Sequence, residues 1–300
     1  MHPHPSFSIT IKTVDHYLQV PDAPDALRLL KEGGFDHIHF SYRWTSVAPC
    51  TMQELEQMKA NLDLEQVRVL DVHGSHPRYK GRNLDLSEES EEGRQLAFDR
   101  FRERLQIAHF FGADAVVYHV PTCNMEDPKI LYRYVEGLKH FEEEARNLGV
   151  SIAIENHFKS ENDKMTLSRC FEIFDPAYVG LTFDTGHAAL SGNQDWILAH
   201  CMSRLKVLHL NDNDGKSDLH HPPYWEHGIV DWEAVTRGIA QSPYQKPMQL
   251  ELKRHADIYP SLEKLIAVSA QSAHRVHQNI DTCRQVEASP DGQGKYTLPS

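Results

Sequence analysis

The stretch from Ala115 to His157 decides the fold class, because it has the pattern of a strand, a helix and a second strand. It opens with Ala115-Val-Val-Tyr-His-Val120 and closes with Ser151-Ile-Ala-Ile-Glu-Asn-His157, two short and mostly apolar runs. Between them, Pro128–Leu148 has helical spacing, and Gly149 follows where a glycine often ends a helix. This order predicts two parallel strands joined by a helix.

The same alternation of short apolar runs and helix-like stretches extends along the whole chain. A second clear helix, Glu89–Phe111, is followed by Gly112. The strand-like runs are Ser8–Val14, His37–Trp44, Val67–Ser75, Ala115–Val120, Ser151–His157, Val179–His187, Leu205–Asp212 and Pro247–Lys253. Eight strands that are each followed by a helix predict an α/β fold, a single-domain (β/α)₈ TIM barrel, rather than an open doubly wound sheet.

The end of the chain differs in composition from the rest. We expect the barrel to occupy residues 1–270, and residues 271–300 to hold the end of a C-terminal helix and a tail. That helix is expected from about Asp257 to about Arg284. The tail Val286–Ser300 is rich in Pro, Gly, Ser and Asp, a composition typical of disordered segments.

Composition and charge exclude several classes of protein. The apolar share of 40% and the charged share of 25% are ordinary for a soluble globular protein. Neither a signal peptide nor an apolar run near the roughly 20 residues of a membrane helix is visible, so we expect a cytoplasmic protein without membrane contact. A formal charge of −12 disfavours a broad nucleic-acid face, so no nucleic-acid partner is expected. The five scattered cysteines form no CxxC pair, which disfavours a disulfide framework and a cysteine zinc site.

Potential ligands gather at the ends of the predicted strands. Enzymes with this barrel place their active sites at the C-terminal strand ends. The residues at or just beyond these ends are His73, His119, Glu155, Asp184, His187, His209 and Glu251. One histidine at a strand end is more often a hydrogen-bonded structural residue than a ligand. Seven such residues together indicate a site.

The alternation of side chains along a strand predicts where the carboxylates point. A period of two places Ala153 and Glu155 on one face of their strand, opposite Ile154. It likewise separates Asp184 from Phe183. The large apolar residues suit the layer between sheet and helices, so the small and polar residues, with the carboxylates, are expected inside the barrel.

Carboxylates that share a buried cavity repel one another unless a cation or a proton compensates their charge. Glu155, Asp184 and Glu251 together with His209 form an oxygen-rich set with one imidazole. This set suits one divalent metal ion, Mn²⁺, Co²⁺, Mg²⁺ or Zn²⁺, with open positions for substrate oxygens. The alternative is a cluster of carboxylates that share protons in a non-enzymatic pocket.

Several sequence blocks resemble the metal-binding blocks of the xylose isomerase-like barrel superfamily. This superfamily contains ketose 3-epimerases, hydroxypyruvate and inosose isomerases, inosose dehydratases and endonuclease IV. The blocks are Ile152-Ala-Ile-Glu155-Asn-His157, Phe183-Asp184-Thr-Gly-His187, Leu208-His209-Leu-Asn-Asp212 and Gln249-Leu-Glu251, and Asp218–Trp232 resembles the family's loop after strand 7. The resemblance implies that Glu155, Asp184, His209 and Glu251 bind the metal.

The first hypothesis for activity is a sugar isomerase or epimerase of carbohydrate metabolism. It would act on a ketose, keto-sugar or keto-polyol through a metal-stabilised enediolate, with Glu155 and Glu251 as the acid/base pair. The expected substrate-binding residues are His187, His73, His119, His220 and Lys253. Many ketose 3-epimerases hold the substrate with an arginine in the loop after strand 7, and no arginine occurs in that stretch here. The expected partner is a small-molecule sugar, and homo-oligomerisation stays open.

Two other activities fit the same barrel. An endonuclease IV-like trinuclear zinc phosphodiesterase uses nine ligands, for which the chain offers His73, His119, Glu155, Asp184, His187, His209, Asp218, His220 and Glu251. The acidic charge and the lack of a loop with clustered Arg and aromatic residues argue against it. A dehydratase or lyase acting on a 3-keto sugar would use the same enolate, with His73, His119 or His157 as the extra acid or base. The count of metals per chain separates the isomerase, with one, from the nuclease, with three.

Overall fold

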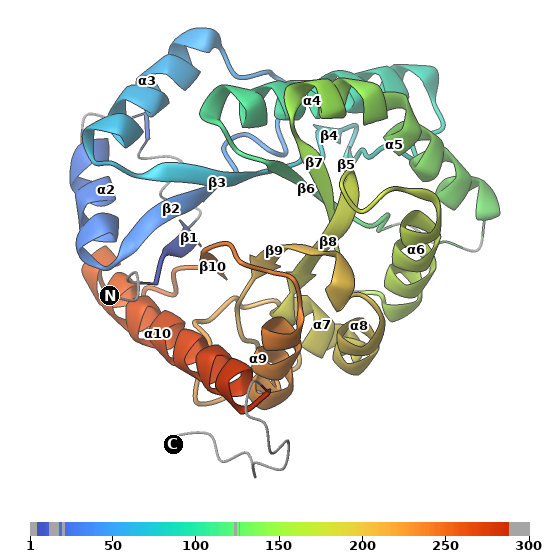
Figure 1. The fold of residues 1–300 in the computed structure, drawn as a ribbon. Coiled ribbons are helices and arrows are strands. Elements are labelled where there is room, and N and C mark those ends of the chain that lie inside the picture. The colour runs from blue at the N-terminus through green and yellow to red at the C-terminus, as the bar shows by residue number, and fades with distance from the viewer. Residues whose placement is uncertain (1–4, 12–17, 20–21, 123–124, 126, 288–300) are drawn as a thin grey trace.

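Eight parallel strands form a ring at the centre of the molecule (Figure 1). The computed structural model describes residues 5–11, 18–19, 22–122, 125 and 127–287. The strands of the ring are β1 (Phe7–Ile11), β2 (Phe35–Phe40), β3 (Arg68–His73), β6 (Ala115–His119), β7 (Ser151–Glu155), β8 (Val179–Asp184), β9 (Leu205–His209) and β10 (Met248–Leu252). Their order is β10-β1-β2-β3-β6-β7-β8-β9, and a parallel bridge between Leu210 and Leu250 joins β9 to β10. The prediction of a (β/α)₈ barrel is confirmed.

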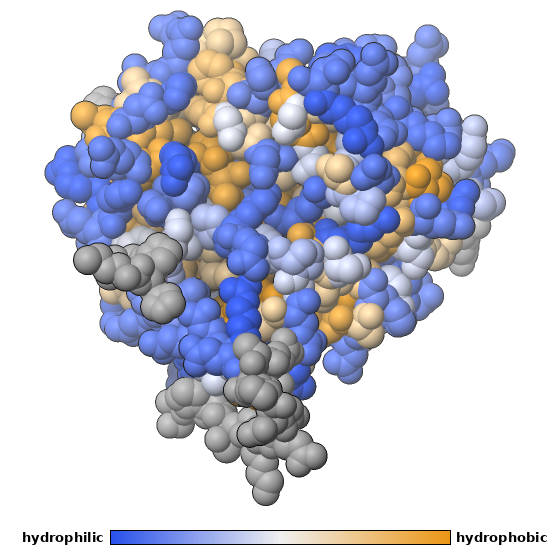
Figure 2. Space-filling view, viewed as in Figure 1, coloured by the Kyte–Doolittle hydropathy of each residue, from blue (hydrophilic) through white to orange (hydrophobic). Residues whose placement is uncertain are grey.

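Helices surround this ring (Figure 1). They are α2 (Ala23–Glu32), α3 (Met52–Leu64), α4 (Glu91–Phe111), α5 (Pro128–Leu148), α6 (Ser160–Ile173), α7 (Thr185–Ser191), α8 (Gln194–His200), α9 (Trp232–Gln241) and α10 (Leu262–Glu287). A short hairpin, β4 (Arg78–Tyr79) and β5 (Arg82–Asn83), lies between β3 and α4 in the chain. No helix among the described residues is long and apolar enough to cross a membrane. The face shown in Figure 2 is mostly hydrophilic, with hydrophobic residues in smaller patches.

The side chains of the strands separate into two layers, as their alternation predicted. Ile152, Ile154 and Phe183 belong to the large apolar cluster that the strands share with the helices. Ala153 belongs to a second, small cluster with Ala115, Val117 and Val207. Because small residues occupy this inner cluster, the barrel interior has room for the polar side chains that follow at the strand ends.

The predicted helix ends were accurate for helix α5 but not for helix α10. Helix α5 begins after Asp127, whose carboxylate accepts a hydrogen bond from the backbone N–H of Lys129, and it ends at Gly149, whose φ of 70° is left-handed. Helix α10 begins at Leu262 and not near Asp257, because Ser261 caps it by accepting a hydrogen bond from the N–H of Lys264. It runs past Arg284 and includes Val286, and the rest of the predicted tail from residue 288 lies outside the described residues.

The predicted strands were too long at their C-terminal ends. The run Val179–His187, for example, ends as a strand at Asp184, and the next residues form helix α7. Polar and aromatic residues that follow a strand continue its pattern in the sequence but already belong to the loops above the barrel. The candidate site lies where the strands end and these segments begin.

Candidate metal centre and active site

Parallel pairing brings the candidate ligands to one level of the barrel. Asp184 on β8 lies opposite His209 on β9, and His119 on β6 lies opposite Glu155 on β7. Glu251 on β10 pairs with Thr10 on β1. Side chains that are far apart in the sequence therefore meet at the same end of the ring.

The four predicted metal ligands converge in the barrel interior. Each of Glu155, Asp184, His209 and Glu251 offers one ligand atom, and these atoms all lie within 4.8 Å of one another. His209 Nδ1 is 2.9 Å from Glu155 Oε1 and 3.2 Å from Glu251 Oε2. Glu155, Asp184 and His209 are buried, whereas 16% of the Glu251 side chain is exposed. The set is thus closed on the barrel side and open toward solvent at Glu251.

Asp184 is held rigidly by its neighbours. One carboxylate oxygen caps helix α7 by accepting a hydrogen bond from the N–H of His187 at 2.7 Å. The other oxygen accepts a hydrogen bond from Asn211 Nδ2 at 3.0 Å. The side chain of Asn156 hydrogen-bonds to both the N–H and the C=O of Asp184. Asn156 and Asn211 both lie in the sequence blocks quoted above, but no local pattern indicated this role for them.

In this set, the negative charges of the carboxylates are balanced by positive charge on neighbouring imidazoles. Burial favours the protonated form of Glu155 and Glu251, but the neighbouring histidines together outweigh it and hold the pKa of both carboxyls well below the usual value. His209 acts on both carboxyls, with His119 beside Glu155 and His220 beside Glu251. Burial also disfavours a charged His209, but Glu251 and Glu155 raise its pKa well above the usual value. Asp184 differs, because burial raises its pKa to about 6.

This donor set fits a divalent cation. Three carboxylates and one imidazole converge, and the buried Glu155 Oε2 makes no well-aligned hydrogen bond, although His119 Nε2 lies 3.1 Å away. An ion placed among them would satisfy that oxygen and take over the role of the protons on the imidazoles. Oxygen-rich sets with one histidine are typical of Mn²⁺, Mg²⁺ and Zn²⁺ sites.

His73 and His119 lie beside the central set. His119 Nε2 is 3.1 Å from Glu155 Oε2, and the rings of His73 and His119 are 4.9 Å apart. Burial lowers the pKa of His73 well below its usual value, and the neighbouring His119 adds to the shift. Trp44 packs on His73, with ring centroids 4.4 Å apart. His73, His119 and Glu155 form a second group whose ligand atoms lie within 4.8 Å.

The loop after β9 brings further polar groups over the site. Asp218 Oδ1 is 2.8 Å from His220 Nε2 and 3.5 Å from His187 Nε2. Its other oxygen accepts a hydrogen bond from Lys253 Nζ at 2.6 Å. Burial disfavours a charged His187, but Asp184 and Asp218 raise its pKa to about 10. A third group of possible ligands consists of Asp184, His187 and His220, whose ligand atoms also lie within 4.8 Å of one another.

All predicted catalytic and substrate-binding residues line one pocket of about 380 Å³. Its lining residues are Thr10, Ser41, Trp44, His73, Asn83, His119, Glu155, His157, Phe158, His187, Asp218, His220, Glu251, Leu252 and Lys253. Trp44 and Phe158 give the pocket aromatic walls that the sequence analysis did not predict. A neighbouring cavity of about 410 Å³, lined by Arg82 and Arg133, holds none of the candidate metal groups found among the described residues.

The match to a family model decides the family. The model of the xylose isomerase-like TIM barrel matches residues 27–276. The chain belongs to this family. The resemblance inferred from the sequence blocks is thereby confirmed.

Two relatives are similar to this barrel over different lengths. An uncharacterised protein, y4fM, from Sinorhizobium fredii is 25% identical over 249 residues, which cover 75% of this chain and 79% of that protein. Inosose dehydratase from Bacillus anthracis is 33% identical over 82 residues, which cover 27% of this chain and 28% of that enzyme. The second likeness is therefore local.

Solved structures share the fold over nearly the whole chain. A D-tagatose 3-epimerase-like protein matches with a TM-score of 0.67 at 17% identity, covering 94% of this chain and 99% of that chain. An IOLI protein with a bound zinc atom has a TM-score of 0.66 at 17% identity, covering 92% and 98%. A xylose isomerase-like barrel protein from Mycobacterium smegmatis in complex with magnesium has a TM-score of 0.67 at 15% identity, covering 94% and 98%. At these identities the likeness shows the fold.

Proposed function

We propose that this protein is a divalent-metal-dependent enzyme that isomerises or epimerises a ketose or keto-sugar. The observation that carries the proposal is the convergence of Glu155, Asp184, His209 and Glu251 within 4.8 Å beneath a pocket. Two of these residues, Glu155 and Glu251, also line the pocket and can reach a bound substrate. Fold neighbours described as epimerase-like, zinc-bound and magnesium-bound support it.

The two glutamates provide the proton transfer. When bound, a divalent ion supplies positive charge to the carbonyl and hydroxyl oxygens of the substrate. Glu155 and Glu251 project from β7 and β10, which two strands separate in the sheet, so they approach the pocket from different directions. Their low pKa values keep both ionised at neutral pH, the state that a base needs. One removes the proton beside the carbonyl and thereby becomes protonated, and in an isomerisation it returns this proton to the neighbouring carbon. In an epimerisation the other glutamate first takes up a proton from solvent and then delivers it to the opposite face of the substrate.

The surrounding cations orient the substrate. His187, with a pKa of about 10, is protonated at neutral pH and donates a hydrogen bond to a substrate oxygen. Lys253 and His220, both held by Asp218 beside His187, contact hydroxyl groups on that side of the pocket, while His73 and His119 contact them near Glu155. A pocket of about 380 Å³ suits one sugar-sized molecule.

Metal analysis followed by an exchange assay tests this function. The full-length protein is purified, its metal content is measured, and it is incubated in D₂O with a panel of ketoses and keto-sugars. We expect about one divalent ion per chain and metal-dependent deuterium incorporation beside the carbonyl of at least one substrate. A fully metal-loaded protein that exchanges no substrate proton in the panel contradicts the proposal.

A dehydratase is the second candidate, favoured by the local likeness to inosose dehydratase. Proton removal beside the carbonyl is the same, but a hydroxyl group then leaves from the neighbouring carbon. His157 lines the pocket next to His119, with ring centroids 4.8 Å apart, but burial lowers its pKa to about 2, so it is neutral and suited to act as a base. His187, whose pKa is about 10, lines the same pocket and is the candidate acid for the leaving hydroxyl. Mass spectrometry of the products distinguishes the two, because only the elimination loses water.

The arrangement of the ligand groups is also compatible with a trinuclear phosphodiesterase, which can be tested. The three groups of possible ligands overlap at Glu155 and Asp184, and Asp218 contacts the third group. Further metals need further anions, and Asp218 is the additional carboxylate of the pocket lining. About three zinc ions per chain together with cleavage of DNA at abasic sites would favour this activity over the isomerase.

A further inference from the structure

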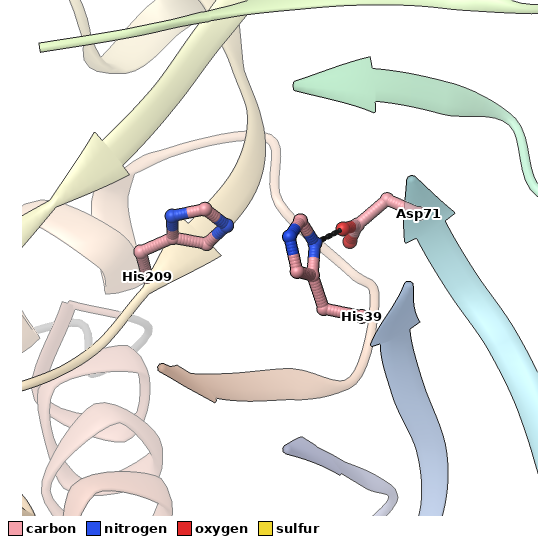
Figure 3. A group of neighbouring side chains, drawn as sticks. All are labelled: His39, Asp71 and His209. Atoms are coloured by element: carbon pink, nitrogen blue, oxygen red, sulfur yellow. Dashed lines mark hydrogen bonds and ion pairs between the residues drawn. The ribbon is translucent and has the colours of Figure 1, made fainter. Parts of the chain in front are cut away.

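A histidine and an aspartate lie in the barrel interior next to the metal centre, and the proposed chemistry does not use them. His39 on β2 and Asp71 on β3 are opposite one another in the strand register, and both are buried. His39 Nδ1 contacts Asp71 Oδ1 (Figure 3). Gln249 Nε2 donates a further hydrogen bond to the same oxygen at 3.4 Å.

The ring of His209 faces this pair (Figure 3). The centroids of the His209 and His39 rings are 4.9 Å apart and the ring planes meet at 81°. His209 Nδ1 is directed at Glu155 and Glu251, so this nitrogen is the one available to a metal. His209 Nε2 and His39 Nε2 are both buried, and neither has a hydrogen-bond partner.

The protons on these rings are complementary. A neutral imidazole carries one N–H, so a metal on His209 Nδ1 leaves the proton on Nε2, where it needs an acceptor. His39 donates its Nδ1–H to Asp71, which leaves the lone pair on its own Nε2 free to accept. The N–H donor would be His209 Nε2, and the acceptor is His39 Nε2. These two atoms belong to rings that face one another.

We propose that Asp71 and His39 form a hydrogen-bond relay that orients His209 and fixes its proton on Nε2, so that Nδ1 binds the metal. They are positioning residues, since they act through His209 and do not line the pocket. The inference rests on the proposed function in that His209 is a metal ligand there. Metal-binding histidines commonly have such a partner on the second nitrogen, and its loss typically costs ~10–100-fold in metal affinity.

A second metal ion among the three residues is the competing explanation. Their ligand atoms also lie within 4.8 Å of one another. However, the group has a single carboxylate, and neither His39 nor Asp71 lines the pocket through which an ion would enter. A chain of hydrogen bonds satisfies the same buried atoms without adding charge, so the relay is favoured.

The test measures the Co²⁺ affinity of the metal-stripped, full-length protein by competition with a chelator. We expect His39→Phe to bind Co²⁺ about 10–100-fold more weakly than the wild type. His39→Gln should recover part of the loss, because its amide oxygen can accept from His209 Nε2. Asp71→Asn keeps the shape of the side chain but not its charge. Its Co²⁺ affinity should lie between those of the wild type and His39→Phe. Circular dichroism checks that each variant is folded.

The matched control is His37→Phe. His37 lies on the same strand and also pairs with an aspartate, Asp36, at 2.8 Å, but two residues before His39 and outside the pocket and the candidate metal groups. Its Co²⁺ affinity should equal that of the wild type. Wild-type affinity in folded His39→Phe and Asp71→Asn, or a second Co²⁺ ion that His39→Phe loses, overturns the relay. If His209→Gln and Glu251→Gln leave Co²⁺ binding unchanged, the proposed metal centre itself fails, whatever His39 does.

Discussion

Glu251 takes part in both the metal set and the pocket, so its substitution separates binding from proton transfer. Glu251→Gln keeps the shape and one oxygen donor but cannot act as a base. We expect turnover to fall by at least ~10²–10⁴-fold, with further loss if metal binding weakens, while the barrel stays folded and binds substrate. Turnover, metal content and circular dichroism check this. Glu226→Gln is the control, because 79% of that side chain is exposed and it does not line the pocket.

His119 separates the isomerase from the nuclease at the scale of one side chain. Its Nε2 lies 3.1 Å from Glu155 Oε2, so it either contacts the substrate or holds an additional metal. We expect His119→Gln to keep about one metal per chain and to lose substrate affinity or turnover. Elemental analysis together with kcat and KM measures both effects. A wild type with about three zinc ions, of which the variant loses at least one, would refute the isomerase assignment.

At the scale of elements, helix α7 packs closely against the segment after β9. A methyl group on Gly186 would lie 1.9 Å from Asn211 Oδ1 and 2.3 Å from Asn213 Nδ2. Asn211 would have to move, and with it the hydrogen bond that it donates to Asp184. The fit of this one short helix therefore affects a candidate metal ligand.

Gly186→Ala tests this coupling. We expect the variant to lose about 1–3 kcal/mol of stability through overpacking, and to bind the metal more weakly because Asp184 is no longer fixed. Urea unfolding and Co²⁺ titration measure the two effects. Gly238→Ala on α9 is the control, since its methyl group would meet the ends of two apolar side chains, Leu198 at 2.6 Å and Met202 at 3.8 Å, and no candidate ligand. Equal metal affinity in both variants would show that the packing of α7 does not position Asp184.

At the scale of the whole molecule, the candidate metal set spans four consecutive strands. Its ligands come from β7, β8, β9 and β10, and the junction of β9 with β10 is the one that closes the ring. Because a metal bound only by the folded chain stabilises it by mass action, removal of the metal should lower the melting temperature.

Thermal unfolding with and without chelator measures that contribution. A metal at 100 times its Kd contributes about 2.7 kcal/mol, which for a chain of 300 residues corresponds to a decrease of roughly 4–5 °C on chelation. Addition of Mn²⁺ to the stripped protein should restore the melting temperature. In Glu251→Gln the metal ligands are weakened, so chelator should lower the melting temperature by a smaller amount than in the wild type. An unchanged melting temperature in a wild type that demonstrably binds the metal contradicts the expected link between site and barrel.

The amino-acid sequence by itself determined the barrel and the strand ends that bear its carboxylates. Both depend on local patterns: the alternation in Ser151–Glu155 sets which side chains share a face, and Asp127 and Gly149 cap the beginning and the end of helix α5. Such signals act over a few residues, so they are visible without the fold. The predicted strands extended several residues past their true C-terminal ends, because the residues beyond a strand continue its sequence pattern.

Only the tertiary structure decided which of the 20 histidines meet, and through which ring nitrogen. His39 was within a predicted strand, yet nothing local indicated that it would face His209 or contact Asp71. Asn211 and Trp44 were unassigned for the same reason. Strand register and closure of the ring set the distances between residues far apart in the chain, and these depend on the packing of the whole barrel rather than on any one segment.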